Sequence, residues 1–188
     1  MSKFIARWHD RLTKSFSDPT AKIISKINPP PVNVLEIGVA NGEGATLITN
    51  AMLKRTPAPE YYGLDLFEER TPEEIRKRLP PGVWAFFYKG DSTKVLPGLD
   101  LPQMDLIIID GGHDYKTVKA DWENVQRLIH KNTTIIFDDY RREAGVTLVV
   151  DSISLSKFDC VPTKVKHVNI MKFPFVFSYV GKCVVTPR

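Results

Sequence analysis

The 188-residue sequence contains little cysteine and no long apolar run. Its two cysteines, Cys160 and Cys183, match neither a disulfide framework nor the spacing of a metal site, and we interpret them as reduced core residues of a cytoplasmic protein. No stretch of eighteen apolar residues is present, which argues against a transmembrane helix. Residues 1–16 place charges among the apolar positions and lack the uninterrupted core of a signal peptide. Internal repeats and low-complexity segments are also missing.

The sequence also lacks a strong charge of either sign. The formal net charge is +4, which would help to attract an anionic substrate but is too small and too evenly spread to indicate nucleic acid binding. The densest basic stretch, residues 162–173, is interpreted as solvated charge on a pair of strands. An apolar fraction of 43% and this chain length are typical of one globular domain with a single core, here residues 1–188.

Residues 1–31 precede the main pattern of the chain. An apolar stripe over residues 4–16 predicts an amphipathic helix, and a second helix, capped by Ser17 or Asp18, should run to about Ile27. These helices are candidates for a lid over a substrate, for a homodimer contact or for a membrane-surface contact. Simple packing against the domain is the plainest alternative.

From residue 32 onward, apolar strands alternate with helices, which predicts an α/β fold with a mostly parallel sheet covered on both faces. The last two strands lack a long helix between them and should pair as a hairpin, adding an antiparallel strand at one edge. The expected strands are 32–38, 61–67, 83–90, 104–110, 133–139, 157–163 and 175–185; the expected helices are 44–55, 71–79, 115–130 and 143–154, with a short turn at 91–97.

A glycine-rich loop, "EIGVANGEGA" at residues 36–45, lies between the first strand and its helix. Glycines at such a place allow the backbone to approach a ligand closely, although they could also serve only a tight turn. The dinucleotide pattern G-x-G-x-x-G is not matched. Asp65 ends the second strand, where an acid can accept hydrogen bonds from ribose hydroxyls. Asp91 follows the third strand, where an acid can accept one from an adenine amino group. Each acid alone would more often be a cap or a turn residue, but together they predict a nucleoside site.

A group of acids follows the fourth and fifth strands. Asp110 ends the fourth strand, and Asp138 and Asp139 end the fifth. Neighbouring parallel strands lie about 4.8 Å apart, so these carboxylates should converge and repel one another unless a cation intervenes. Oxygen ligands favour Mg²⁺, although Mn²⁺ or Ca²⁺ would fit the same ligands. Alternatively, the two later aspartates could pair with Arg141 and Arg142 or cap the next helix.

Three further residues beside these acids have competing interpretations. His113 carries an imidazole, a group suited to taking a hydroxyl proton near neutral pH, but it could also be a turn residue bonded to the backbone. Asp114 is interpreted as the cap of the helix that begins at Tyr115. Trp122, in the middle of that helix, is interpreted as a core residue.

The segments "VLEIGVANGEGA", "YYGLDLF", "YKGDS", "MDLIIIDGGHDY" and "IIFDDY" occur in this order and together resemble class I S-adenosylmethionine-dependent methyltransferases. The resemblance is nearest to the small O-methyltransferases that modify macrolide and aminocoumarin sugars. It implies a Rossmann-like, seven-stranded sheet with one reversed strand. It also implies that Glu36 and Asp65 flank the ribose of the cofactor, that Gly38 and Gly42 lie beneath its methionine end, and that Asp91 lies near adenine. The cofactor-binding residues thus expected are Glu36, Gly38, Ala40, Gly42, Asp65, Leu66, Asp91, Ser92 and Asp110.

From the residues and the resemblance we predict a metal-assisted O-methyltransferase acting on a small hydroxylated acceptor, a sugar or a diol. Asp110, Asp138 and Asp139 would bind the divalent cation, and His113 would take the proton, with Asp110 beside it in the catalytic centre. Two alternatives stay open: a metal-independent methyltransferase for another nucleophile, including nucleic acid or protein, and a non-catalytic module that binds S-adenosylmethionine.

Overall fold

The computed structural model describes residues 19–163 and 181–188. The helix expected over residues 4–16, the capping residues Ser17 and Asp18 and the start of the last strand lie outside the described residues. Within them, the elements follow one another as α2 Pro19–Ile24, β1 Asn33–Ile37, α3 Glu43–Leu53, β2 Glu60–Asp65, α4 Pro72–Arg76, β3 Trp84–Lys89, α5 Ser92–Val95, η1 Leu96–Gly98, β4 Met104–Ile109, α6 Tyr115–Val125, η2 Gln126–Leu128, β5 Ile129–Phe137, α7 Ala144–Asp151, β6 Phe158–Pro162 and β7 Cys183–Pro187.

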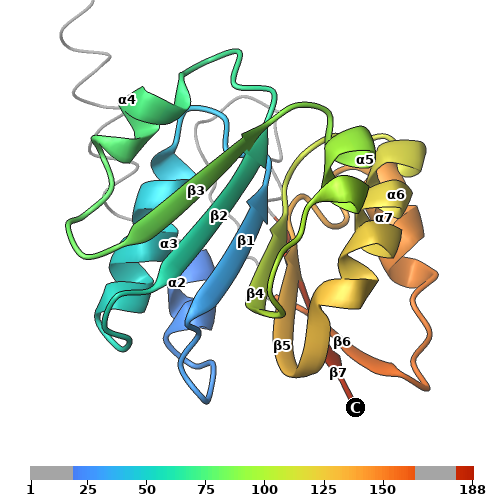
Figure 1. Cartoon of the computed structure of the whole chain (residues 1–188). Helices are drawn as coiled ribbons and strands as arrows, with labels where there is room; N and C mark the ends of the chain where they lie inside the picture. The colour runs from blue at the N-terminus through green and yellow to red at the C-terminus, as the bar shows by residue number, and fades with distance from the viewer. Residues whose placement is uncertain (1–18, 164–180) are drawn as a thin grey trace, which may run out of the picture.

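The seven strands form one sheet in the order β3-β2-β1-β4-β5-β7-β6. All described pairings are parallel except those of β7, which runs antiparallel to both β5 and β6. Helices cover the two faces of the sheet, with α2, α3 and α4 on one side and α5, α6 and α7 on the other (Figure 1). The predicted Rossmann-like fold with one reversed strand is therefore confirmed.

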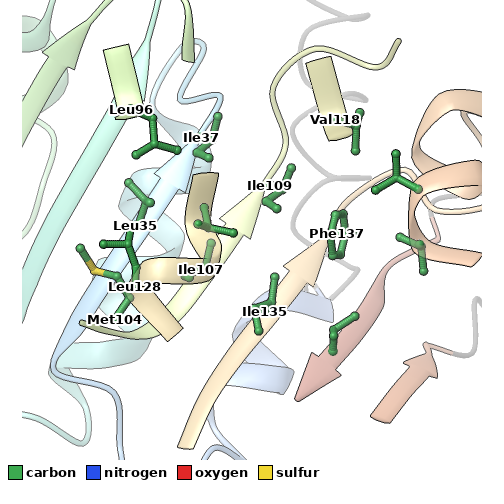
Figure 2. Close-up of a cluster of buried hydrophobic side chains, with 14 of the residues drawn as sticks. Leu35, Ile37, Leu96, Met104, Ile107, Ile109, Val118, Leu128, Ile135 and Phe137 are labelled. Carbon is green, nitrogen blue, oxygen red and sulfur yellow. The ribbon is translucent and has the colours of Figure 1, made fainter. Parts of the chain in front are cut away.

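Alternate side chains of each central strand enter different halves of the core. Leu35, Ile107, Ile135 and Phe137 pack beneath α6 and α7 (Figure 2), whereas their immediate neighbours along the strands pack on α2 and α3. Because side chains of a strand point alternately to opposite faces, a sheet covered on both sides requires nearly continuous apolar strands. This requirement explains why the buried strands were visible in the sequence.

The structure corrects two expected boundaries. The helix expected over 115–130 ends at Val125, and its last residues form a 3₁₀ turn and the first two residues of β5, because Ile129 pairs with Met104 in the sheet. The turn expected at 91–97 contains instead the short helix α5 and the 3₁₀ turn η1, since Asp91 caps the backbone N–H of Thr93. No helix among the described residues has the length and apolar character needed to cross a membrane.

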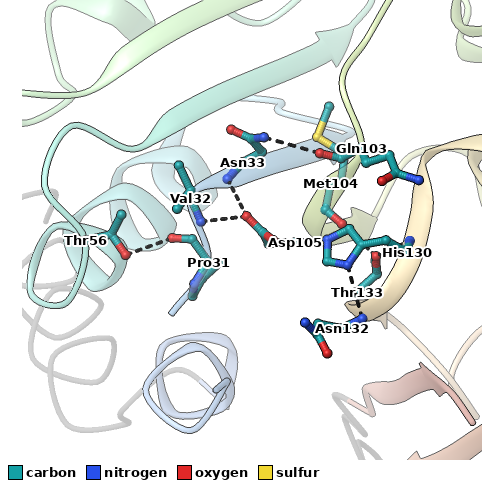
Figure 3. Close-up of polar contacts among 10 residues, drawn as sticks. All are labelled: Pro31, Val32, Asn33, Thr56, Gln103, Met104, Asp105, His130, Asn132 and Thr133. Atoms are coloured by element: carbon teal, nitrogen blue, oxygen red, sulfur yellow. Dashed lines mark hydrogen bonds and ion pairs between the residues drawn. The ribbon is translucent and has the colours of Figure 1, made fainter. Parts of the chain in front are cut away.

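A polar cluster joins the strands at their amino ends, away from the glycine loop (Figure 3). Oδ2 of Asp105 accepts hydrogen bonds from the backbone N–H groups of Val32 and Asn33, at 2.8 and 2.9 Å. Its Oδ1 lies 3.1 Å from Nε2 of His130, at the start of β5. These contacts fix β1 against β4 and β5, so we assign this aspartate–histidine pair a structural role.

Candidate active site

The candidate site lies at the carboxyl ends of β1 and β4, where the order of the strands reverses. Ligands of open α/β sheets bind at such a switch point. Gly38 follows β1 with a φ of +92°, and a Cβ at this position would lie only 2.1 Å from the carbonyl oxygen of Asp110. Only glycine permits this approach, which places the loop after β1 directly against the loop after β4.

Asp65, at the end of β2, organises the glycine loop. Its Oδ2 accepts hydrogen bonds from the backbone N–H groups of Val39 and Ala40, at 2.8 and 3.0 Å, and its Oδ1 accepts one from Phe67 at 2.6 Å. A carboxylate offers about four acceptor positions, so these contacts leave room for one hydroxyl of a ligand. The neighbouring Leu66 is 49% exposed and offers an apolar contact beside it.

Glu36 is buried beneath the same loop and is only 3% exposed. The hydroxyl of Tyr61 donates a hydrogen bond to its Oε2. Burial raises the pKa of Glu36 to about 8, against the opposing effects of the Tyr61 hydrogen bond and of Lys182. Its Oε1 would lie 2.6 Å from a Cβ at Gly44. Glu36 therefore supports the start of α3 from beneath the loop, and its place beside the ribose stays a prediction.

The acids expected to contact the nucleoside are partly used by their own helices. Asp91 caps α5 through the N–H and hydroxyl of Thr93, at 3.0 and 2.7 Å, and pairs with Lys94 at 2.8 Å. The Lys94 and Thr93 contacts lower the pKa of Asp91 to about 2. Gly42 is the N-cap of α3 and has a φ of +81°. Asp91 thus sets the shape of the loop after β3, and Ser92 is the first residue of α5.

Asp110, His113 and Asp139 form a compact cluster, with one possible ligand atom of each within 4.8 Å of the others. Nε2 of His113 lies 3.3 Å from Oδ2 of Asp139, and the guanidinium of Arg142 lies 3.1 Å from its Oδ1. The Arg142 contact is the pairing that the sequence left open as an alternative. Since Arg142 is half exposed, this ion pair contributes little to stability.

The two carboxylates of the cluster are donors of the kind that a hard divalent cation takes, and they lie close enough together to share one ion. Oxygen ligands of Mg²⁺ lie about 2.1 Å from the ion, so that opposite ligands of one octahedron are about 4.2 Å apart. Asp139 is 8% exposed and has a φ of +53°, a conformation that costs non-glycine residues of order 1–3 kcal/mol. In this conformation the Asp139 carboxylate lies close to both His113 and Asp110.

Asp138 lies outside this cluster, although the sequence predicted it as a third metal ligand. The buried ammonium of Lys182 contacts its Oδ2, and its Oδ1 accepts the backbone N–H of Asp139 at 2.8 Å. Lys182 directly precedes β7 and is 5% exposed. This pair could not be predicted from the sequence, because 44 residues separate the partners and only the pairing of β5 with β7 brings them together.

Replacing Lys182 by methionine is expected to lower the free energy of unfolding by about 2 kcal/mol, because it leaves the Asp138 carboxylate largely buried without its cation. The loss stays moderate because Asp138 keeps the hydrogen bond from Asp139. Urea unfolding measures the change. The double variant Lys182→Met, Asp138→Asn should recover more than half of the loss, and a double variant as unstable as the sum of the singles would contradict the ion pair.

Two interpretations of residues in and before α6 are confirmed. Oδ1 of Asp114 accepts the backbone N–H groups of Lys116 and Thr117, at 3.0 and 3.1 Å, and so caps α6. The ring of Trp122 packs between those of Phe137 and Phe158, with centroids 5.7 and 5.3 Å away.

The same helix carries a buried acid, Asp121, that the sequence reasoning missed. A signal was present, since Asp121 interrupts the buried stripe formed by Val118 and Val125.

Comparison with known proteins places these observations in a family. The family described as "Methyltransferase domain" matches residues 35–140 of this chain, from β1 through the acidic cluster. No curated protein sequence matches the chain.

Several solved structures share the fold. The O-methyltransferase TomG from Streptomyces achromogenes, solved with S-adenosylmethionine and involved in tomaymycin synthesis, aligns over 92% of this chain and 81% of its own, with a TM-score of 0.65 and 14% identity. An O-methyltransferase from Bacillus cereus, solved with S-adenosylhomocysteine, aligns over 92% and 82%, with a TM-score of 0.66 and 16% identity. CalS11, a TDP-rhamnose 3′-O-methyltransferase of calicheamicin biosynthesis, aligns over 77% and 70%, with a TM-score of 0.58 and 16% identity.

Proposed function

Since the chain belongs to the methyltransferase-domain family, we propose that it is an S-adenosylmethionine-dependent O-methyltransferase that methylates a hydroxyl of a small sugar or diol with the help of a divalent cation. The observation that carries the proposal is the cluster of Asp110, His113 and Asp139 beside the glycine loop. It combines two carboxylates and an imidazole next to the place where nucleoside ligands bind in this type of sheet.

The cofactor assignment follows from the residues of the loops after β1 and β2. Asp65 would accept a ribose hydroxyl at its remaining acceptor position, and Leu66 would cover the base. Gly38 and Ala40 would border the methionine end, where Gly38 brings the loop against Asp110. The structures of TomG with S-adenosylmethionine and of the Bacillus cereus enzyme with S-adenosylhomocysteine, which have the same fold, support this choice.

Asp110 and Asp139 would hold the cation. Bound there, a divalent ion makes an acceptor hydroxyl more acidic and orients a vicinal diol for in-line attack on the methyl group. Asp138 is not among the proposed ligands, because both of its oxygens are engaged by Lys182 and by the Asp139 backbone. The sugar acceptor is supported by the fold shared with CalS11, whose own substrate is a TDP-rhamnose.

His113 is proposed to take the acceptor proton. Its side chain is 44% exposed and its Nε2 lies 3.3 Å from Oδ2 of Asp139, which would stabilise the imidazolium formed on proton transfer. The same contact favours a second candidate, a metal-independent methyltransferase in which the His113–Asp139 pair alone serves as the base. The observation in its favour is that His113 and Arg142 lie 3.3 and 3.1 Å from the Asp139 carboxylate, so that groups of the protein itself can balance its charge.

Chelation distinguishes the two candidates. We expect formation of S-adenosylhomocysteine from S-adenosylmethionine with a panel of sugars and catechol-like diols in the presence of Mg²⁺. EDTA should lower the rate at least about tenfold, and an excess of Mg²⁺ should restore it. Turnover that is indifferent to EDTA and to added Mg²⁺ would favour the metal-independent base. Binding of the cofactor without turnover of any acceptor would favour a non-catalytic module.

A further inference from the structure

Asp121 is a buried carboxylate that the proposed reaction does not use. It lies on the inner face of α6, is 0% exposed, and neither of its oxygens meets a hydrogen-bond donor in good geometry among the described residues. A buried charged group without partners is costly, and most buried polar groups in proteins are satisfied. We therefore look among the groups around Asp121 for a donor that could form a hydrogen bond with its carboxylate.

Asp121 is surrounded by the loop after β3 and the loop after β4, which both border the proposed cofactor site. Its Oδ2 would lie 3.7 Å from a Cβ at Gly111, the residue after Asp110. From the other side, the hydroxyl of Ser92 is close enough to lower the pKa of the carboxyl. Ser92 opens α5, which packs on α6 (Figure 1). Asp121 thus lies between the loop after β3 and the loop after β4.

The charges that face Asp121 repel it rather than hold it. Burial is the largest cause that raises the pKa of Asp121 to about 6. The Ser92 hydroxyl opposes this rise, whereas Asp91 at the cap of α5 and Asp114 at the cap of α6 add to it. Lys94, the cation of α5, is already paired with Asp91 at 2.8 Å. A carboxylate in this position weakens the ligand-free protein, which is consistent with a functional reason for its presence.

We propose that Asp121 is a positioning residue for the adenosine part of the cofactor. When adenosine lies between the loop after β3 and the loop after β4, the Asp121 carboxylate accepts a hydrogen bond from the Ser92 hydroxyl and so holds Ser92 in place relative to Gly111. This inference rests on the proposed cofactor. Asp121 does not touch the ligand, since its oxygens are fully buried, and it acts through the position of Ser92 and of Gly111.

The test measures S-adenosylhomocysteine binding by calorimetry, and thermal unfolding without ligand, for Asp121→Asn, Ser92→Ala and the double variant at pH 8. Asp121→Asn should weaken binding about fivefold, because an uncharged amide oxygen accepts the Ser92 hydrogen bond less strongly than a carboxylate, and it should raise the Tm of the ligand-free protein by at least about 2 °C, because it removes a repelled buried charge. Ser92→Ala removes the donor and should weaken binding at least as much. The double variant should bind no worse than Ser92→Ala alone.

The matched control is Glu123→Gln, which removes a charge from an exposed position of the same helix and should change neither quantity. A purely structural role predicts instead that Asp121→Asn lowers the Tm and leaves the affinity of the folded protein unchanged, and that result would overturn the inference. So would losses of the two single variants that add up in the double variant. A wild-type protein that does not bind S-adenosylhomocysteine would overturn the proposed function and this inference together.

Discussion

Asp139→Asn is expected to lower the rate of methyl transfer at least about 100-fold, because the substitution removes one of the two carboxylates proposed to hold the cation. Losses of 10–100-fold are typical when only the outer hydrogen-bonding partners of a metal site are removed, so loss of a ligand should exceed them. The same change removes the negative partner of His113, which lies 3.3 Å away, and so weakens the proposed base as well. The steady-state rate in saturating Mg²⁺ measures the loss.

A second measurement separates metal binding from catalysis. A ligand that binds only the folded protein raises its Tm, so Mg²⁺ should stabilise the wild-type protein and should no longer stabilise Asp139→Asn. Asp100→Asn is the charge-matched control. Asp100 is exposed in the loop that precedes β4, at the amino ends of the strands and so away from the candidate site. An Asp139→Asn variant that keeps both its rate and its response to Mg²⁺ would remove Asp139 from the metal site.

Gly38→Ala is expected to abolish cofactor binding and to lower the free energy of unfolding by about 4 kcal/mol or more. The alanine Cβ would lie 2.1 Å from the Asp110 oxygen, 2.4 Å from its carbonyl carbon and 2.7 Å from the Gly111 nitrogen. These are backbone atoms that no side-chain rotation can move away, and the φ of +92° adds strain of its own. Relief of the contact would have to separate the loops after β1 and β4, and Asp110 would move with them.

Chemical unfolding and calorimetry with S-adenosylhomocysteine measure the two effects of Gly38→Ala. The control is Gly98→Ala, where an added Cβ meets nothing within 4 Å, so the stability and the affinity should both stay near the wild-type values. A Gly38→Ala protein with wild-type stability and affinity would show that the loops after β1 and β4 do not need this close contact.

Much of the fold was visible in the sequence, because a parallel sheet covered on both faces demands strands that are apolar throughout. The run over Met104–Ile109 and the run that ends at Phe137 carry this signature without help from the rest of the chain. Local chemistry also determined the helix starts. Thr71 with Pro72 begins α4 and Asp114 begins α6, as expected, since a capping side chain bonds to N–H groups only two or three residues away. The end of α6 was misjudged because sheet pairing of Ile129 with Met104 overrides the helical periodicity.

Within the candidate site, the sequence by itself determined which chemical groups end the strands, because a strand that leaves the core must stop at a polar residue or a turn. Asp65, Asp110 and Asp139 were found in this way. Only the tertiary structure decided which of these groups meet. The fold brings His113 close to Asp139 and pairs Asp138 with Lys182, which is 44 residues away in the sequence. It also buries Glu36 and Asp121 beside the loops of the candidate site. The spacing along one strand specifies the face on which a side chain lies, but pairing between distant strands and the low dielectric of the interior determine its partner and its charge.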